Sequence, residues 1–166
     1  LRIRPDDSAG EFISFIHRDG RGALWVSVLG LGLCRMEEDG SFLIFNKSTH
    51  PEFPNNEFES MLEDDEGNFW IGGFGLVRFS PQTGKISCFS RKDGLQSNAF
   101  KMYDAARLSD GRMAFGGING FNVFSPSDII DNTDSPQVCL TSLVINGSPC
   151  DSLLRDGIPV RRRESL

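Results

Sequence analysis

Long apolar runs, basic patches and helical periodicity are all scarce in this sequence. No apolar run approaches the ~20 residues that a membrane-spanning helix needs, and no stretch of three turns shows a helical period with caps. The net charge is −6 and the basic cluster at 161–163 stands alone, whereas nucleic-acid binders present basic patches that neutralise phosphates. We therefore expect no nucleic-acid binding. The chain begins at Leu1 without a methionine or a signal peptide, so we expect it to be a piece of a longer protein.

Residues that usually perform catalysis or hold metals are also few. The four cysteines and two histidines show no metal-ligand spacing. His17 falls at a strand position and His50 in a proline-flanked link, so no catalytic triad can be assembled from them. The acidic run at 63–66 lacks the alternating ligands and the distal glutamate of a calcium loop, and we expect a hairpin turn there. The sequence predicts no catalytic residue, no metal site and no cofactor, and it leaves the ligand-binding residues unknown.

One short motif, by contrast, occurs three times. It reads GALWVS from Gly22, GNFWIG from Gly67 and GRMAFG from Gly111. The first two glycines are 45 residues apart and the last two are 44 apart. A period of about 40–45 residues is typical of the four-stranded sheets, or blades, that stack to form a β-propeller. The signature residues of the repeat are Gly22, Trp25, Gly67, Trp70, Gly72, Gly111 and Gly116; Ser27 replaces the final glycine in the first copy, and Ala114 replaces tryptophan in the third.

Each repeat reads as short strands joined by tight turns. The segments before the three glycines alternate partly between apolar and polar residues, as half-buried strands do, and Asp, Asn and Gly dominate the turns. The first two repeats contain four such segments, whereas Ser125-Pro126 ends the third before an obvious fourth strand. We expect first strands near 12–17, 58–63 and 102–108. The chain is therefore expected to be all-β, a partial β-propeller of about three four-stranded antiparallel blades at about 10–50, 55–97 and 98–130.

The repeat also predicts which side chains are buried. Trp25 and Trp70 could stack on a sugar ring, but they share one repeat position, so we expect them to pack between neighbouring blades. Cys34 and Cys88 replace the apolar residues Val77 and Ile44 of the neighbouring repeat, so we expect both to be small buried hydrophobes. Whether Cys139 and Cys150 form a disulfide is left open, since that depends on an oxidising compartment.

Several of these segments resemble one known family. Residues 65–72 and 75–79, and the link at 93–98, are similar to the two-component regulator propeller repeat. Residues 115–126 resemble the closing blade of such a propeller, and residues 136–147 resemble the first strand of the Ig-like Y_Y_Y domain that follows it. The resemblance spans about residues 12–147. It implies that residues 1–130 are the C-terminal blades of a propeller, and that residues 131–166 are a linker and the start of an Ig-like β-sandwich.

The resemblance also implies a function. Proteins of this family are the extracytoplasmic sensor regions of hybrid two-component histidine kinases, so the chain is expected to be a non-enzymatic fragment on the periplasmic side of an inner-membrane protein. The ligand of the intact parent is expected to be an oligosaccharide, whose binding is relayed across the membrane to control transcription.

Two alternatives remain open. A glycosidase or lyase needs paired carboxylates, and Glu59 and Asp104 lie on first strands but not at equivalent positions. A protein-interaction propeller of the WD type lacks its diagnostic residue pairs here.

We also expect self-association, as a dimer. Three blades leave two outer faces without neighbours, and the third sheet has an open edge that residues 138–145 could fill.

Overall fold

The computed structural model describes residues 12–130 and four short strands, β12 (Cys139–Leu140), β13 (Val144–Ile145), β14 (Ser148–Pro149) and β15 (Ile158–Pro159). The chain divides into two compact units, Leu1–Ile130 and Asp131–Leu166. In the second unit, β12 pairs with β15 and β13 with β14. Most of the segment predicted to begin an Ig-like domain lies outside the described residues, as does the question of a Cys139–Cys150 bond. Within the described part of the chain, no helix is long and apolar enough to cross a membrane.

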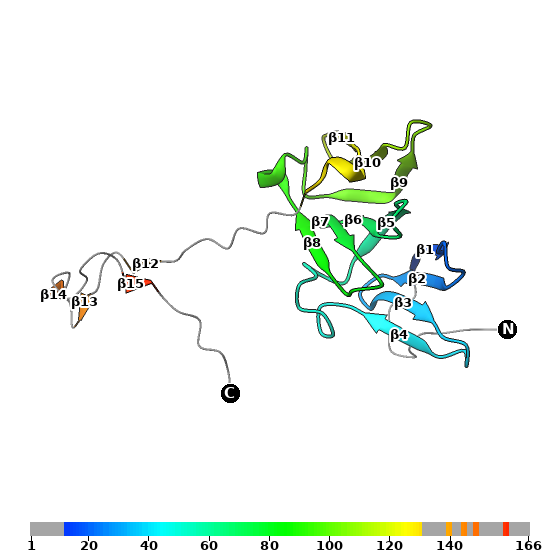
Figure 1. Ribbon diagram of the computed structural model, residues 1–166, viewed down its shortest axis with the longest axis horizontal. Coiled ribbons are helices and arrows are strands. Elements are labelled where there is room, and N and C mark those ends of the chain that lie inside the picture. The colour runs from blue at the N-terminus through cyan, green and yellow to red at the C-terminus, as the bar shows by residue number, and fades with distance from the viewer. Residues whose placement is uncertain (1–11, 131–138, 141–143, 146–147, 150–157, 160–166) are drawn as a thin grey trace. The chain divides into compact units, whose positions relative to one another are not determined.

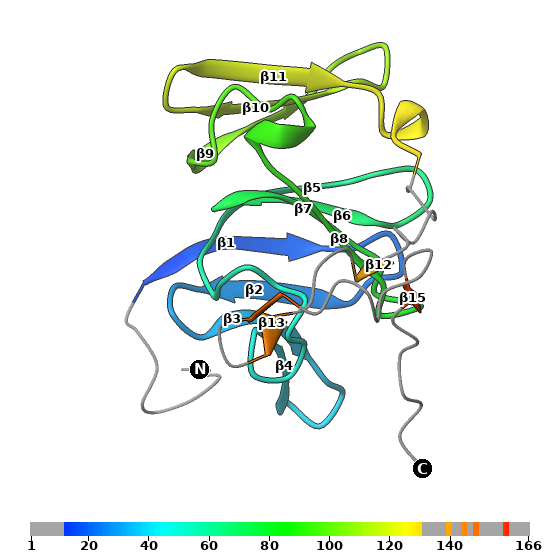
Figure 2. The same cartoon turned by 90° about the vertical axis from the view of Figure 1, so that its left-hand side faces the viewer.

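The first unit consists of three antiparallel sheets, stacked one upon another (Figures 1 and 2). Blade 1 contains β1 (Ile13–Arg18), β2 (Leu24–Val28), β3 (Gly32–Met36) and β4 (Phe42–Phe45). Blade 2 contains β5 (Phe58–Glu63), β6 (Phe69–Gly73), β7 (Gly75–Phe79) and β8 (Ile86–Phe89). Blade 3 contains β9 (Phe100–Arg107), β10 (Met113–Gly117) and β11 (Gly120–Phe124). The prediction of an all-β partial propeller is confirmed.

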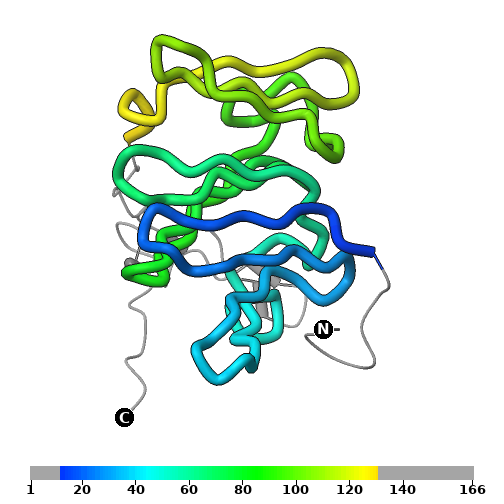
Figure 3. Tube along the Cα trace, turned by 90° about the vertical axis from the view of Figure 1, so that its right-hand side faces the viewer, coloured from blue at the N-terminus to red at the C-terminus, as the bar shows by residue number. Residues whose placement is uncertain are grey.

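The strands of each blade follow one another in sequence order, so the first strand always lies at the same edge of its sheet. Figure 3 shows β1, β5 and β9 on one side of the stack. Two short 3-10 helices, Arg91–Asp93 and Pro126–Asp128, follow β8 and β11. Pro126 begins the second of these shortly after β11 ends, and within the described part of the chain blade 3 has three strands. The described part of residues 138–145 pairs with β14 and β15 and not with β11.

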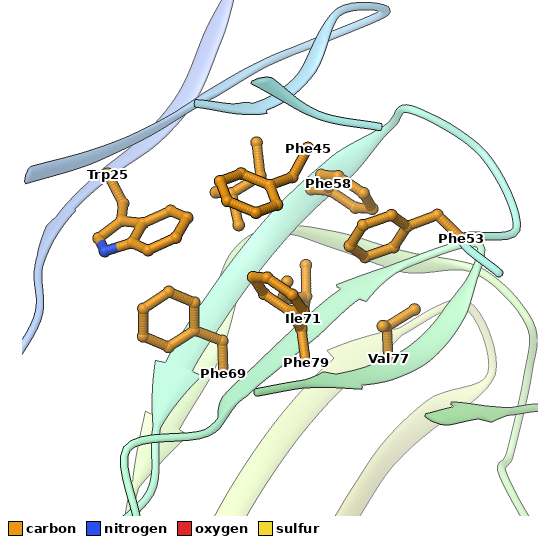
Figure 4. Packing of buried hydrophobic residues seen from close by; sticks show 9 residues of the cluster. Trp25, Phe45, Phe53, Phe58, Phe69, Ile71, Val77 and Phe79 are labelled. Carbon is orange, nitrogen blue, oxygen red and sulfur yellow. The ribbon is translucent and has the colours of Figure 1, made fainter. Parts of the chain in front are cut away.

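Aromatic side chains fill the space between blades. Figure 4 shows the cluster between blades 1 and 2, in which the Trp25 ring lies 5.3 Å from Phe45 and 4.9 Å from Phe69, with Phe79 beside them at 6.2 Å. Trp70 occupies the matching place between blades 2 and 3. Trp25 and Trp70 are 0% and 1% exposed, as the repeat predicts.

Each of these tryptophans is held by an aspartate and an arginine of its own blade. Trp25 Nε1 donates to Asp19 Oδ2 at 2.8 Å, and the Arg35 guanidinium lies 5.7 Å from the ring centroid. In blade 2, Trp70 Nε1 donates to Asp64 Oδ2 at 2.9 Å, and Arg78 lies 5.5 Å from the ring. The same aspartates also accept hydrogen bonds from backbone amides of the following turn. We call this arrangement the Asp–Trp–Arg brace.

Blade 3 has lost all three members of the brace. Ala114 and Val123 face each other across β10 and β11, as Trp70 and Arg78 do across β6 and β7. Leu108 begins a turn with the same backbone hydrogen bonds as the turn after Asp64. The three positions therefore change together.

The prediction for Cys88 is wrong. Cys34 is fully buried, as expected, and burial raises the pKa of its thiol to about 11. Cys88 is exposed, and its Sγ lies 3.3 Å from the carbonyl oxygen of Glu52, to which it donates. The reason is that β8 is the outer edge strand of blade 2, and among the described residues no further strand lies outside it.

Candidate functional site

The strands reverse direction at two opposite ends of the blade stack. At one end, which we call the turn end, lie the turns that follow the first strand of each blade, together with the β3–β4 and β7–β8 connections. At the other, which we call the link end, lie the β2–β3, β6–β7 and β10–β11 hairpins and the links between blades. The two ends present different chemistry.

Cavities at the turn end are lined by side chains that already serve the fold. One cavity of about 220 Å³ lies between blades 2 and 3, and one of about 480 Å³ lies between blades 1 and 2. Asp19 and Asp64, which line them, hold the tryptophans. Arg107 Nη2 pairs with Asp65 Oδ1 at 2.5 Å, and Asp110 pairs with Arg112. The acidic run forms the turn predicted for it. Among the described residues no cluster of three or more potential metal ligands occurs.

The electrostatics of Asp19 reflect its structural task. Burial by itself raises the pKa of this carboxyl group, but hydrogen bonds from the Trp25 indole and from the backbone amides of Ala23 and Arg21 outweigh burial. The net effect is a pKa below the usual value, because the donors stabilise the charged form.

The two histidines have structural surroundings. His17 lies in β1 as predicted, and its Nε2 is 2.8 Å from Glu63 Oε2 of blade 2. Glu63 also accepts from the backbone amide of Gly20, so this carboxylate ties the first turn of blade 1 to blade 2. His50 lies in the link, with its ring 5.2 Å from Phe45 and its Nδ1 2.9 Å from Thr49 Oγ1.

The signature glycines serve turns and close packing. Gly22, Gly67 and Gly111 have φ of 92°, 77° and 87°, which L side chains rarely adopt. A Cβ at Gly72 would lie 2.7 Å from Ser60 Oγ and 3.1 Å from Phe100 Cβ, so the absence of a side chain lets blade 3 approach. Blade 1 solves the same contact differently, since Ser27 Oγ donates to the Phe58 carbonyl of blade 2 at 2.9 Å.

The link end of blades 2 and 3 exposes large side chains. Phe74, at the tip of the β6–β7 hairpin, is 62% exposed, and Ile118, at the tip of the β10–β11 hairpin, is 49% exposed. Ala99 brings the two tips together, because it forms a β-bridge with Phe74 and accepts a hydrogen bond from the Ile118 amide at 3.0 Å. Two apolar side chains of neighbouring blades are thus presented to solvent at one place.

Tyr103 projects from a bulge in β9 near these tips. Phe115 pairs with Ala105 and Gly117 with Phe100, so four residues of β9, 101–104, lie opposite Gly116 alone. Tyr103 has φ of 64° and is 71% exposed. A bulky residue with positive φ is unusual, and such strained positions concentrate where function requires a particular orientation. The sequence analysis missed this bulge, whose trace is that β9 has eight residues where the equivalent strand β5 has six.

We take Phe74, Tyr103 and Ile118 as the candidate site and call them the link-end cluster. Lys101, Asp104 and Asn119 are exposed beside them in the same segments. The set combines apolar faces with hydrogen-bonding groups, which suits a ligand that has both. The sequence had left the ligand-contacting residues unknown. Glu59 is half-buried in β5, and Asp104 is exposed in the bulge.

Stacked four-stranded antiparallel sheets with this period define a class, that of β-propeller blades. Residues 52–75, which run from the link through β6, match the family described as two component regulator propeller. This segment contains the Gly67–Trp70 motif and the first half of blade 2.

Known proteins with similar sequences or structures include a histidine kinase, a hybrid two component system and a lyase. The chain is 34% identical over 91 residues to histidine kinase P4 of Formosa agariphila; the match covers 54% of this chain and 7% of that protein. The extracellular domain of a B. thetaiotaomicron protein named as a hybrid two component system superposes with a TM-score of 0.68 at 20% identity, over 92% of this chain and 20% of its own. Virginiamycin B lyase from Staphylococcus aureus gives 0.51 at 16% identity, over 74% and 43%. The chain thus spans less than a tenth of the curated relative.

Proposed function

We propose that this chain belongs to the extracytoplasmic ligand-sensing region of a hybrid two-component histidine kinase. The support is the propeller repeat at 52–75, the similarity to a histidine kinase and the fold shared with an extracellular domain of a hybrid two component system. The kinase activity and the membrane anchor would belong to other parts of a longer protein. The chain itself would act by binding, and ligand binding would be relayed across the membrane to control transcription.

The ligand, in this proposal, is an oligosaccharide, and the link-end cluster contacts it. One observation carries the proposal: Phe74 and Tyr103 expose their rings, whereas most aromatic side chains of the blades are buried or half-buried and only Phe12 and Phe121 are exposed besides them among the described residues. The C–H faces of a sugar ring pack against aromatic rings, while its hydroxyl groups need polar partners such as the exposed Lys101 and Asp104.

Isothermal titration of the full chain against a panel of plant and host oligosaccharides tests this proposal. For a sugar that binds, Phe74→Ala and Tyr103→Ala are expected to weaken binding by about tenfold each, equivalent to about 1.4 kcal/mol. Leu43→Ala is the control, because Leu43 is 45% exposed in β4 of blade 1, a blade that contributes no residue to the link-end cluster. Failure of every sugar to bind, or equal weakening by the control, would refute it.

An enzymatic role is the second candidate, since a lyase shares the blade architecture. It predicts turnover of a bound polysaccharide, which product analysis by mass spectrometry detects. A binding protein leaves the sugar intact.

A further inference from the structure

The third strands of blades 2 and 3 are followed by the same dipeptide, Ser-Pro, but the chain then takes two different courses. In blade 2 the turn closes at Gly84, which has φ of 73° and donates its amide to the Ser80 carbonyl at 2.8 Å. Ile129 lies at the position of Gly84 in blade 3, 45 residues later, and has φ of −87°. Because a side chain rarely adopts the glycine conformation, the chain leaves blade 3 by another route. We call residues 126–130 the exit segment.

Blade 2 helps to hold this exit segment, although the segment follows the last strand of blade 3. Arg78 Nη1, on β7 of blade 2, donates to the Ile129 carbonyl oxygen at 3.1 Å. The Ile129 side chain packs against the buried cluster of Trp70 and Phe115, to which both blades contribute. The exit segment is thus fastened across the contact between blades 2 and 3.

Arg78 is held in an orientation that suits this task. Its guanidinium group lies 5.5 Å from the centroid of the Trp70 ring, and its side chain is half-buried. A guanidinium group is planar, so stacking on an indole ring limits the directions in which its N–H groups point. A charged donor also forms a stronger hydrogen bond to a carbonyl oxygen than a neutral donor does.

The equivalent arginine of blade 1 has a different partner. Arg35 lies 5.7 Å from the Trp25 ring, but its Nε donates to Glu37 Oε1 of the same blade at 2.8 Å. Blade 2 has Ser80 at the position of Glu37. The same arginine position therefore serves its own blade in blade 1 and the exit segment in blade 2.

The two blades that hold the exit segment also form the link-end cluster. Phe74 comes from blade 2, whereas Tyr103 and Ile118 come from blade 3. Arg78 and Pro126 line one cavity between these blades at the turn end, so the exit segment and the link-end cluster lie at opposite ends of one contact. Close-packed interiors transmit small shifts instead of absorbing them, and this contact therefore joins the two places physically.

We propose that Arg78 is a latch, which keeps the exit segment docked while blades 2 and 3 fit closely and releases it when their fit changes. The contact between these blades would then control the segment from which the chain continues into the second unit. The latch itself needs no ligand. Its use as a relay rests on the proposed function, because a sugar bound to the link-end cluster would touch both blades.

Amide exchange of the full chain, followed by mass spectrometry, tests the latch without any sugar. The amides of Asp128 and Ile129 donate to carbonyl groups of the preceding residues, so they have protection to lose. Arg78→Met keeps an apolar stem beside Trp70 but removes the donor. We expect it to speed exchange in peptides that cover 125–130 by at least about tenfold, a factor equivalent to about 1.4 kcal/mol. Arg35→Met is the matched control and should leave this exchange unchanged.

A second pair of variants tests whether the fit of the blades controls the latch. Gly72→Ala places a Cβ 3.1 Å from Phe100 Cβ of blade 3, so it should separate the two blades and speed exchange at 125–130. Its control is Ser27→Ala, which removes a hydrogen bond between blades 1 and 2 and should have no effect there.

The melting temperature shows whether each variant still folds. Should Arg78→Met unfold the chain, Ile129→Ser decides, because it alters only the half-buried end of the exit segment and is also expected to speed exchange. Unchanged exchange at 125–130 in folded Arg78→Met, Gly72→Ala or Ile129→Ser would overturn the latch, and so would an equal effect of Arg35→Met. Because no sugar is present, these results are independent of whether the proposed ligand binds.

Discussion

Replacing Trp70 by alanine tests the central claim that one ring joins two blades. Trp70 is 1% exposed, packs 5.7 Å from Phe89 and 4.8 Å from Phe124, and donates to Asp64. Truncating a buried tryptophan to alanine costs about 3–5 kcal/mol. Leaving the buried Asp64 carboxylate without its indole donor adds about 1–3 kcal/mol. The total, roughly 4–8 kcal/mol, is comparable with the whole stability of roughly 5–15 kcal/mol that a domain has.

We therefore expect Trp70→Ala to separate blade 3 from the stack or to unfold the chain. Urea unfolding followed by circular dichroism and by the fluorescence of the remaining tryptophan measures the change. Trp70→Phe keeps most of the ring but removes the N–H donor, so its loss should be smaller, about 1–3 kcal/mol. Phe121→Ala is an exposed control and should change stability by no more than about 0.5 kcal/mol. A loss below about 1 kcal/mol for Trp70→Ala would refute the reasoning.

Three further predictions concern pH, packing and association. The pKa of Asp19 is lowered in the folded chain, so the ionised carboxylate contributes its full stability above the usual pKa of 3.8. That contribution is lost as the pH falls through the lowered pKa. Between pH 7 and pH 3, about the carboxyl range, the urea midpoint of Asp19→Asn should therefore fall less steeply than that of the unchanged chain. Gly72→Ala should destabilise the chain by about 1–3 kcal/mol, because its Cβ would meet Ser60 Oγ and Phe100 Cβ, and adding Ser60→Ala should recover part of the loss in thermal melts. Ile16 is 63% exposed on β1, so light scattering should show a species above 18.4 kDa that Ile16→Glu shifts toward the monomer; a monomeric parent chain at high concentration would contradict this.

The period of the repeat was enough to predict the blades and the burial of both tryptophans. A position that recurs every 44–45 residues has the same surroundings each time, so Trp25 and Trp70 could be placed without knowing any contact. The same logic failed for Cys88. Alignment with an apolar residue predicts which face of the strand a side chain lies on. How deeply that side chain is buried depends on whether another strand lies outside its own strand.

Other features needed the structure. An aspartate lies six residues before each tryptophan, and it is absent where tryptophan is absent; this pairing was visible in the sequence but had no meaning until the indole hydrogen bond was seen. The Tyr103 bulge depends on where in β9 the additional residues form an irregular segment, and the spacing of the motifs does not determine that position. The link-end cluster consists of residues outside the repeated motif, so no periodicity points to them.

The brace gives the stack a polarity. Asp19, Trp25 and Arg35 all come from blade 1, and Asp64, Trp70 and Arg78 all come from blade 2. Blades 1 and 2 thus each carry a complete Asp–Trp–Arg brace on one face. The next blade contributes phenylalanine rings from its opposite face, such as Phe69, which packs against the Trp25 ring of blade 1. The contact between neighbouring blades is head-to-tail: the tryptophan face of one blade meets the phenylalanine face of the next. A blade turned over in the stack could not form this contact. Blade 3 receives the tryptophan of blade 2 in this way but has no Asp–Trp–Arg brace of its own, so the repeated contact ends with blade 3.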